Sequence, residues 1–166
     1  MDGCDLVAGV VALNGGKLVG KTRLQKTLYL LDRDSGLDYE YHYYGPFSEE
    51  LANAADDAIQ LGQLEYEDRP GFHSVPYRIY ISKASITPPA TLGGLSSETI
   101  QNKLEIMNRF SALELEVAAT ILFLADDFLI DDPYTEVSRK KPLKATPERI
   151  ARAKQLISDL GTKLPK

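Results

Sequence analysis

The sequence predicts an α+β protein that is mostly helical, with a winged helix-turn-helix-like N-terminal unit and a C-terminal helical extension. Up to residue 83, local patterns follow the order helix, helix, short strand, helix, strand, loop, strand. After residue 96, apolar residues recur at helical spacing. The 166 residues, 43% of them hydrophobic, suit one hydrophobic core. We therefore expect a single domain of residues 1–166, in which residues 96–162 pack on a winged-helix-like unit of residues 1–83.

Two helices are predicted at the start of the chain. The apolar run within residues 5–13 is typical of a short helix or a buried strand, and we favour the helix. A second helix is predicted over residues 22–33, where leucine recurs at i, i+4 and i+7. These leucines are Leu24, Leu28 and Leu31. Because Arg23 and Lys26 fall outside the leucine stripe, we expect both side chains to face solvent.

A short strand, a third helix and a hairpin follow. Alternating tyrosines predict a strand over residues 39–43 that runs into a turn at Gly45-Pro46. Ser48 is the expected N-cap of the third helix, and Gly62 is its expected stop. The expected apolar face of this helix consists of Leu51, Ala54 or Ala55, Ala58 and Leu61. Residues 64–67 and 77–81 then predict two strands joined by a long loop.

The second half of the chain is predicted to be helical after a linker. Residues 84–95 contain a Pro-Pro and a Gly-Gly pair, which indicate the linker. The fourth helix is marked by Ile100, Leu104 and Met107. Ser111 and Glu114 are spaced as a capping box for a fifth, apolar helix that runs to about residue 128. We expect residues 131–145 to form a loop.

A last helix is predicted after this loop. Thr146 is its expected N-cap and Pro147 its first residue, because proline is favoured at that position. Gly161 ends it. Its apolar stripe consists of Ile150, Ala153, Ile157 and Leu160.

Composition excludes several classes of function. A single cysteine, Cys4, excludes an internal disulfide, and together with two histidines in unrelated contexts it offers no metal-ligand spacing. No nucleophile and base can be paired, so we expect no catalytic residues, no metal, no cofactor and no enzyme activity. The longest apolar runs are too short to cross a bilayer, and no basic segment precedes them. We expect a cytoplasmic protein without a membrane partner.

One motif suggests nucleotide chemistry. Residues 15–22 match G-x-x-x-x-G-K-[ST], the loop whose backbone amides hold phosphates. Leu18 replaces a glycine that would bring the backbone close to phosphate. Residues 121–126, the candidate magnesium-binding strand, lie in a segment predicted to be helical, and the other strands form a hairpin rather than a parallel sheet. We therefore interpret residues 15–22 as a turn followed by a basic helix start, with a nucleotide-binding protein as a remote alternative.

Several segments resemble known families. The segments GKTRLQKTLYLLD (residues 20–32), YHYYGPFSEEL (41–51) and SALELEVAATILFL (111–124), together with residues 141–160, are similar to the YwgA-like family of uncharacterised prokaryotic proteins. This resemblance implies a winged-helix-like fold and no established reaction. A weaker likeness, in the Leu-Gln-Lys helix and the Gly-Pro turn, is to the Panacea antitoxin domain. That likeness implies binding and neutralisation of a toxin.

The third helix decides between a protein and DNA as partner. Its outward face is expected to carry Glu50, Asn53, Asp57 and Gln60, with Glu49 and Asp56 beside them. No lysine or arginine occurs from residue 48 to residue 64, and carboxylates repel phosphates. The leading hypothesis is therefore a non-catalytic regulatory or protein-binding module with a partner of basic surface. Its tentative site consists of Tyr44, Gly45, Pro46, Glu50, Asn53 and Asp57.

Tyr44 is the expected anchor of this site. Strand alternation places Tyr39, Tyr41 and Tyr43 against the core and leaves His42 and Tyr44 on the other side. Tyrosine is enriched among the residues that dominate interface energies. Internal packing of Tyr44 is the alternative.

A winged-helix transcriptional regulator is the second hypothesis. Its DNA surface would consist of Lys21, Arg23, Lys26, Arg69, Arg78 and Lys83. With a formal net charge of -5, we expect DNA binding to be weak and salt-dependent. Other cations gather over residues 139–154, and we interpret them as a solvated face.

Overall fold

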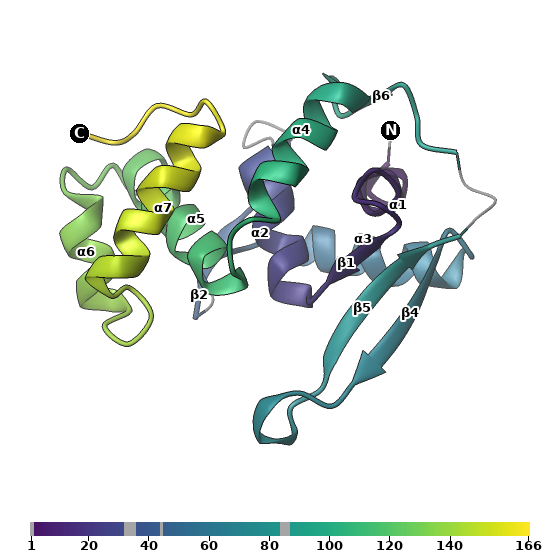
Figure 1. Ribbon diagram of the computed structural model, residues 1–166, viewed down its shortest axis with the longest axis horizontal. Coiled ribbons are helices and arrows are strands. Elements are labelled where there is room, and N and C mark those ends of the chain that lie inside the picture. The colour runs from purple at the N-terminus through teal and green to yellow at the C-terminus, as the bar shows by residue number, and fades with distance from the viewer. Residues whose placement is uncertain (1, 32–35, 44, 84–86) are drawn as a thin grey trace.

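The computed structural model describes residues 2–31, 36–43, 45–83 and 87–166 (Figure 1). The fold is α+β and mostly helical, as predicted. The elements of the first half are α1 (Gly3–Leu13), β1 (Lys17–Val19), α2 (Lys21–Leu31), β2 (Glu40–His42), β3 (Gly45–Phe47), α3 (Glu49–Gln60), β4 (Leu64–Arg69), the short 3-10 turn η1 (Phe72–Ser74) and β5 (Tyr77–Ser82). The predicted helix at residues 5–13 is confirmed as α1, which begins at the N-cap Asp2.

A small antiparallel sheet lies beside α1. Its strand order is β1-β5-β4, and β4 and β5 form the predicted hairpin, which projects from the body of the molecule (Figure 1). β1 was not predicted, because three residues are too few to show a strand pattern. It pairs with β5, where Leu18 lies opposite Tyr80 and both side chains are buried. The order of helices and strands predicted from the sequence therefore lacks one strand of this sheet, β1.

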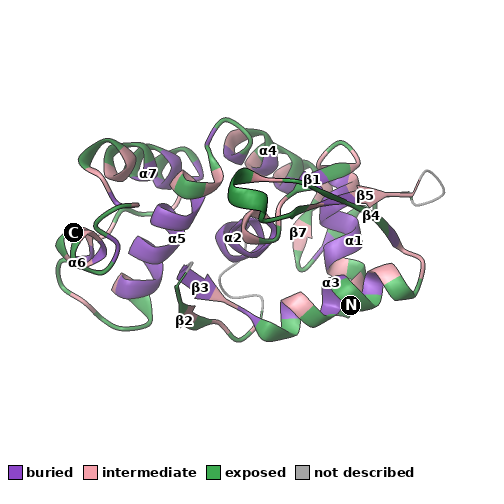
Figure 2. Cartoon of the chain, turned by 90° about the horizontal axis from the view of Figure 1, so that it is seen from below, coloured by how far each residue is buried: buried purple, intermediate pink, exposed green. Residues whose placement is uncertain are grey.

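α2 is the central helix, and its burial contradicts a sequence prediction. Every described residue from Leu24 to Leu31 is buried, including Lys26, which is 1% exposed. From Leu24 to Leu31 the expected solvent side is covered, because β3, α4, α5 and β5 contact this helix. Figure 2 shows α2 and α5 coloured mainly as buried. The prediction that Lys26 faces solvent is wrong.

The segment after β2 also differs from the prediction. Gly45 and Pro46 do not form a free turn but lie in β3, which pairs with β2 and contacts α5, and both residues are buried. Tyr43 was expected against the core and is 75% exposed, because the strand β2 ends at His42 and alternation stops there. Tyr44 lies outside the described residues.

α3 matches its prediction except at the end. Ser48 caps it by accepting a hydrogen bond from the Leu51 amide, and Leu51, Ala54, Ala55 and Ala58 are buried. Leu61 was placed on the same apolar face but is 69% exposed. Leu61 is the C-cap, one residue beyond the last helical residue, Gln60, and therefore does not share the buried face of the helix.

The second half contains β6 (Thr91–Leu92), β7 (Leu95–Ser96), α4 (Ser97–Met107), α5 (Ala112–Asp126), α6 (Pro133–Lys140) and α7 (Pro147–Asp159). The predicted linker includes the small β6–β7 hairpin, in which Leu92 is buried. The capping box of Ser111 and Glu114 and the Thr146 cap are confirmed. The described residues contain no helix with the length and apolar character to cross a membrane.

The predicted loop at residues 131–145 is wrong, because α6 lies within it. Asp132 caps this helix by accepting a hydrogen bond from the Thr135 amide, and Pro133 is its first residue. Proline after a capping residue is a helix start signal that the sequence offered here and at Thr146-Pro147. α6 packs on α5 and so places residues 140–144 near β2.

Candidate functional site

The predicted protein-binding residues are exposed on α3 but buried in β3. Glu50, Asn53 and Asp57 are exposed on α3, as predicted. Gly45 and Pro46 are buried against α5, so they offer no surface to a partner. The predicted anchor Tyr44 lies outside the described residues. Of the predicted protein-binding residues, only those on α3 are both described and exposed.

The exposed side of α3 is called here the acidic face. It consists of Glu49, Glu50, Asn53, Asp56, Asp57 and Gln60, all exposed. Two more exposed carboxylates, Asp2 and Asp5, begin α1, which packs on α3. Burial raises the pKa of the Cys4 thiol, and the nearby carboxylates of Asp2, Asp57 and Asp5 raise this pKa further. Negative charge thus extends from the acidic face of α3 to the start of α1.

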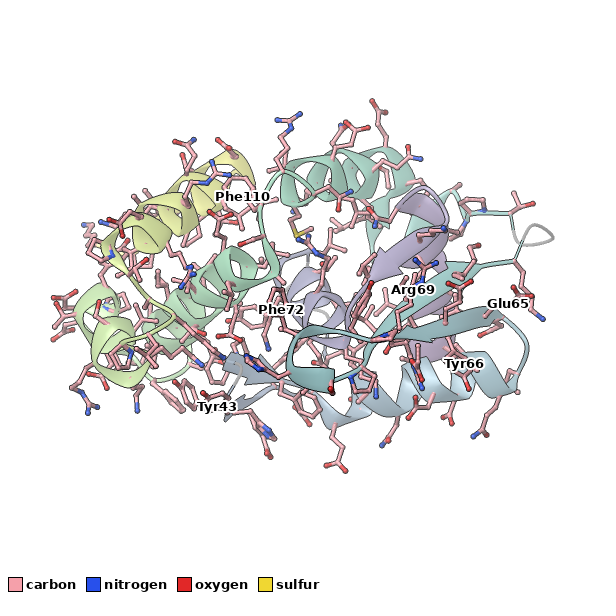
Figure 3. All side chains as sticks on the ribbon, turned by 60° about the horizontal axis from the view of Figure 1, so that its bottom comes forward. Tyr43, Glu65, Tyr66, Arg69, Phe72 and Phe110 are labelled. Atoms are coloured by element: carbon pink, nitrogen blue, oxygen red, sulfur yellow. The ribbon has the colours of Figure 1, made fainter. Side chains whose placement is uncertain are left out.

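The hairpin arginines predicted for DNA are held by carboxylates. Arg78 donates two hydrogen bonds to Asp68, at 2.9 and 3.0 Å, and lies 3.7 Å from Asp56 of the acidic face. Its guanidinium also lies over the Tyr66 ring. Arg69 donates to Glu67 at 2.8 Å. Figure 3 shows Glu65, Tyr66 and Arg69 along the outer strand of the hairpin.

The other predicted DNA contacts do not form one basic surface. Lys21 is exposed and Lys83 is half-buried. Arg23 donates to the backbone carbonyls of Met107 and Phe110, at 3.4 and 2.6 Å, and so joins α2 to the end of α4. Lys26 is buried and donates to the Pro46 carbonyl at 2.6 Å.

The residues of the nucleotide motif have a different arrangement from a phosphate loop. Within residues 15–22, the stretch from Lys17 to Val19 is a strand in an antiparallel sheet, and Leu18 is buried. Residues 121–126, considered as a magnesium-binding strand, lie in α5. The backbone here is engaged in strand pairing instead of surrounding an anion.

A cluster of charged residues is buried where α2, α5 and the end of α6 meet. Glu116 of α5 is 1% exposed. Its Oε2 lies 3.6 Å from Lys141 Nζ and 3.1 Å from Lys144 Nζ. Lys141 also donates to the Tyr43 carbonyl. Lys26 completes this lysine cluster, whose members are Lys26, Glu116, Lys141 and Lys144.

A pocket opens beside the cluster. This lysine pocket has a volume of about 220 Å³ and is lined by Tyr41, Tyr43, Lys140, Lys141, Pro142, Leu143 and Lys144. Lys144 Nζ lies 4.4 Å from the centre of the Tyr43 ring, and Lys140 Nζ lies 5.2 Å from that of Tyr41. Ammonium groups over aromatic faces are stabilised by the ring quadrupole. Figure 3 shows Tyr43 beside the short β2–β3 hairpin.

Comparison with known proteins supports the resemblance found in the sequence. The chain is 28% identical over 154 residues to the uncharacterized protein YwgA of Bacillus subtilis (strain 168). The match covers 89% of this chain and 90% of that protein. The similarity to YwgA-like proteins is confirmed. No family model matches the chain.

Sequence reasoning about this chain missed the lysine cluster. The signal was Glu116, a carboxylate near the start of the mostly apolar stretch from Leu115 to Leu124. A charge in a helix that is buried on all sides needs partners of opposite charge. The interpretation of residues 139–154 as a solvated face is wrong for Lys141, which is 6% exposed.

Because Lys26 is buried, we expect the free energy of unfolding to depend measurably on pH. Burial lowers its pKa from 10.5 to about 7; Glu116 opposes this shift, while Lys141 and Lys144 add to it. Above pH 7 the unfolded chain holds a proton that folded Lys26 has lost, so raising the pH favours folding. Below pH 7 both states are protonated, and the full cost of the buried charge remains. We expect this group to raise the free energy of unfolding between pH 7 and 9 by at most about 1.4 kcal/mol per pH unit.

Urea unfolding of the wild type and of Lys26→Met across this range measures the effect. The variant should lack the rise, while the titration of all other groups cancels in the difference. Parallel pH profiles for the two proteins would contradict a depressed pKa at Lys26.

Proposed function

We propose that this chain is a non-catalytic, protein-binding regulatory module built on a winged-helix unit of residues 1–83. The order of α1, β1, α2, α3 and the β4–β5 hairpin supports this assignment, as does the sheet order β1-β5-β4. In such a unit α3 occupies the place of the helix that reads a DNA groove.

The acidic face of α3 is the observation that carries the proposal. Four carboxylates, those of Glu49, Glu50, Asp56 and Asp57, are exposed on the helix that would have to approach phosphate. Phosphate contacts need lysine or arginine, and carboxylates at that place repel the backbone of DNA. A basic protein surface instead gains from complementary charge, which speeds association and selects the partner.

The hairpin adds apolar surface next to these charges. Phe72 at its tip is 92% exposed, Val75 65% and Tyr66 47%. Arg78 joins the two regions, because it contacts both Asp56 of the acidic face and the Tyr66 ring. Exposed aromatic side chains beside charges are typical of interface anchors. The partner is thus expected to present a basic surface with an apolar pocket, and the likeness to the Panacea domain makes a basic toxin one such partner.

Site-specific photo-cross-linking in cells tests this surface. A photoreactive residue at Asn53 should capture a protein, whereas the same residue at Asn102, an exposed asparagine on α4, should not. Glu50→Lys with Asp57→Lys should weaken binding of the captured partner at least about tenfold, because two attractive charges become repulsive. The matched control is Glu98→Lys with Glu105→Lys, which changes the charge equally on α4.

Two outcomes would overturn the proposal. Equal capture from Asn53 and Asn102, or equal loss in both charge-reversed proteins, would show that α3 has no special surface. A duplex selected from random DNA that binds at nanomolar concentration in physiological salt, and loses discrimination with Asn53→Ala or Gln60→Ala, would favour the transcriptional regulator.

A further inference from the structure

We propose that a second copy of this chain binds the acidic face and the β4–β5 hairpin, and that its lysine pocket receives the ring of Phe72. The second copy is a partner of the surface proposed above, so this assignment rests on the proposed function. That surface requires a basic partner with an apolar pocket, and the chain itself carries both features. Figure 1 shows α6 and α7 at one end of the molecule, away from α3 and the hairpin, so the two surfaces do not cover each other within one copy.

The two surfaces differ in the sign of their charge. α3 contains four carboxylates and no lysine or arginine. Residues 139–154 contain seven lysines and arginines and one carboxylate, Glu148. Among these cations, the exposed ones are Arg139, Lys140, Arg152 and Lys154. Opposite charges on two protein surfaces speed association and orient the partners.

The exposed cations of α6 and α7 make ion pairs that a partner can compete with. Arg139 and Lys140 share the carboxylate of Glu136. Arg152 contacts Glu114. The side chains of Arg139 and Arg152 are 68% and 49% exposed. Because ion pairs between exposed groups are individually weak, the carboxylates of a second copy compete with these internal contacts.

The tip of the hairpin presents Phe72 on a closed turn. The Val75 amide donates a hydrogen bond to the Phe72 carbonyl at 3.1 Å, and a Cβ atom at Gly71 would clash with the Val75 carbonyl oxygen. His73 and Ser74 have φ values of 54° and 62°. Non-glycine residues rarely adopt this region, and such strain is concentrated at functional segments. A closed turn loses little conformational freedom on binding, which favours Phe72 as an anchor.

The size and walls of the lysine pocket suit one aromatic side chain. Its volume of about 220 Å³ is below the roughly 300–1,000 Å³ typical of sites for drug-sized ligands. Tyr41, Tyr43 and Leu143 provide aromatic and apolar walls. Aromatic rings pack favourably edge to face or offset against each other. The lysines of the wall also attract the face of an inserted ring.

Analytical ultracentrifugation of the purified chain at up to about 1 mM tests the association. The average mass should rise with protein concentration at about 50 mM salt and fall at about 500 mM salt, which screens exposed charges. Glu50→Lys with Asp57→Lys should weaken association at least about tenfold, and so should Lys140→Glu with Lys154→Glu. An equal mixture of these two double variants should form a dimer of one copy of each. In that dimer the intact acidic face of one variant meets the intact basic surface of the other.

Phe72→Ala should weaken association of the wild type at least about tenfold, whereas Leu113→Ala, at another exposed apolar side chain, should not. Glu98→Lys with Glu105→Lys, on α4, is the charge control and should associate as the wild type does. A monomer at every concentration, unchanged association of Phe72→Ala, or no dimer in the mixture would overturn the proposal. If the chain stays monomeric while a photoreactive residue at Asn53 captures a different protein, the proposed function holds and only the second copy is rejected.

Discussion

Replacing Glu116 with glutamine is expected to lower the free energy of unfolding by about 3–5 kcal/mol at pH 7, as measured by urea denaturation. The substitution keeps the shape of the side chain and removes its charge. Lys141 and Lys144 then lose the carboxylate that both contact, and Lys26 loses the attraction that favours its proton. Since the Glu116 side chain is 2% exposed, water does not replace it as a partner. The loss reflects buried positive charges that no longer face the Glu116 carboxylate.

The matched control is Glu105→Gln, at an exposed position of α4, which should change stability by less than about 0.5 kcal/mol. Adding Lys144→Met to Glu116→Gln should recover part of the lost stability, because it removes one of the repelling charges. This double variant also gives a measurable protein if Glu116→Gln alone does not fold. Equal losses from Glu105→Gln and Glu116→Gln, or a double variant less stable than Glu116→Gln, would contradict the electrostatic account.

Gly45→Ala is expected to destabilise the protein by about 3 kcal/mol, through a strained backbone and a steric clash. Gly45 has a φ of 88°, a conformation that side chains rarely adopt. A Cβ atom at this position would lie 2.6 Å from Thr120 Oγ1 of α5, closer than van der Waals contact permits. Thermal unfolding of the variant measures the sum of both effects.

Gly94→Ala separates the two contributions. Gly94 has a φ of 85°, and a Cβ atom there would have no neighbour within 4 Å. This control should therefore lose only about 1 kcal/mol, from backbone strain alone. In a Thr120→Ala background, which lacks the clashing oxygen, Gly45→Ala should cost less than in the wild type. If Gly45→Ala and Gly94→Ala lose the same amount in the wild type, β3 does not pack tightly on α5.

The local sequence predicted α1 to α5 and α7 and most of their boundaries, but not α6. Ser48, Ser111 and Thr146 cap α3, α5 and α7 because each accepts a hydrogen bond from an amide three residues later, a contact that needs no distant partner. The hairpin of β4 and β5 was likewise predicted from neighbouring residues. The acidic face followed from helical periodicity, since the buried side of α3 carries leucine and alanine.

Only the tertiary structure decided which residues of α2 and β3 are accessible. Periodicity along α2 reports one apolar stripe, but α5 and β3 cover the opposite side, and so Lys26 is buried. Gly45-Pro46 has the local chemistry of a turn, yet it pairs with β2 and packs on α5, so that both residues lie in a buried strand.

The lysine pocket depends on residues far apart in the chain. Tyr43, Glu116 and Lys144 come from three separate segments, and no local pattern places them together. Their charges interact only when α6 packs on α5 and brings residues 140–144 against β2. The sequence by itself determined the helices other than α6, their caps and the acidic face, because these rest on contacts within a few residues. The buried lysines and their pocket were decided by packing, because electrostatic balance depends on distances that local patterns do not contain.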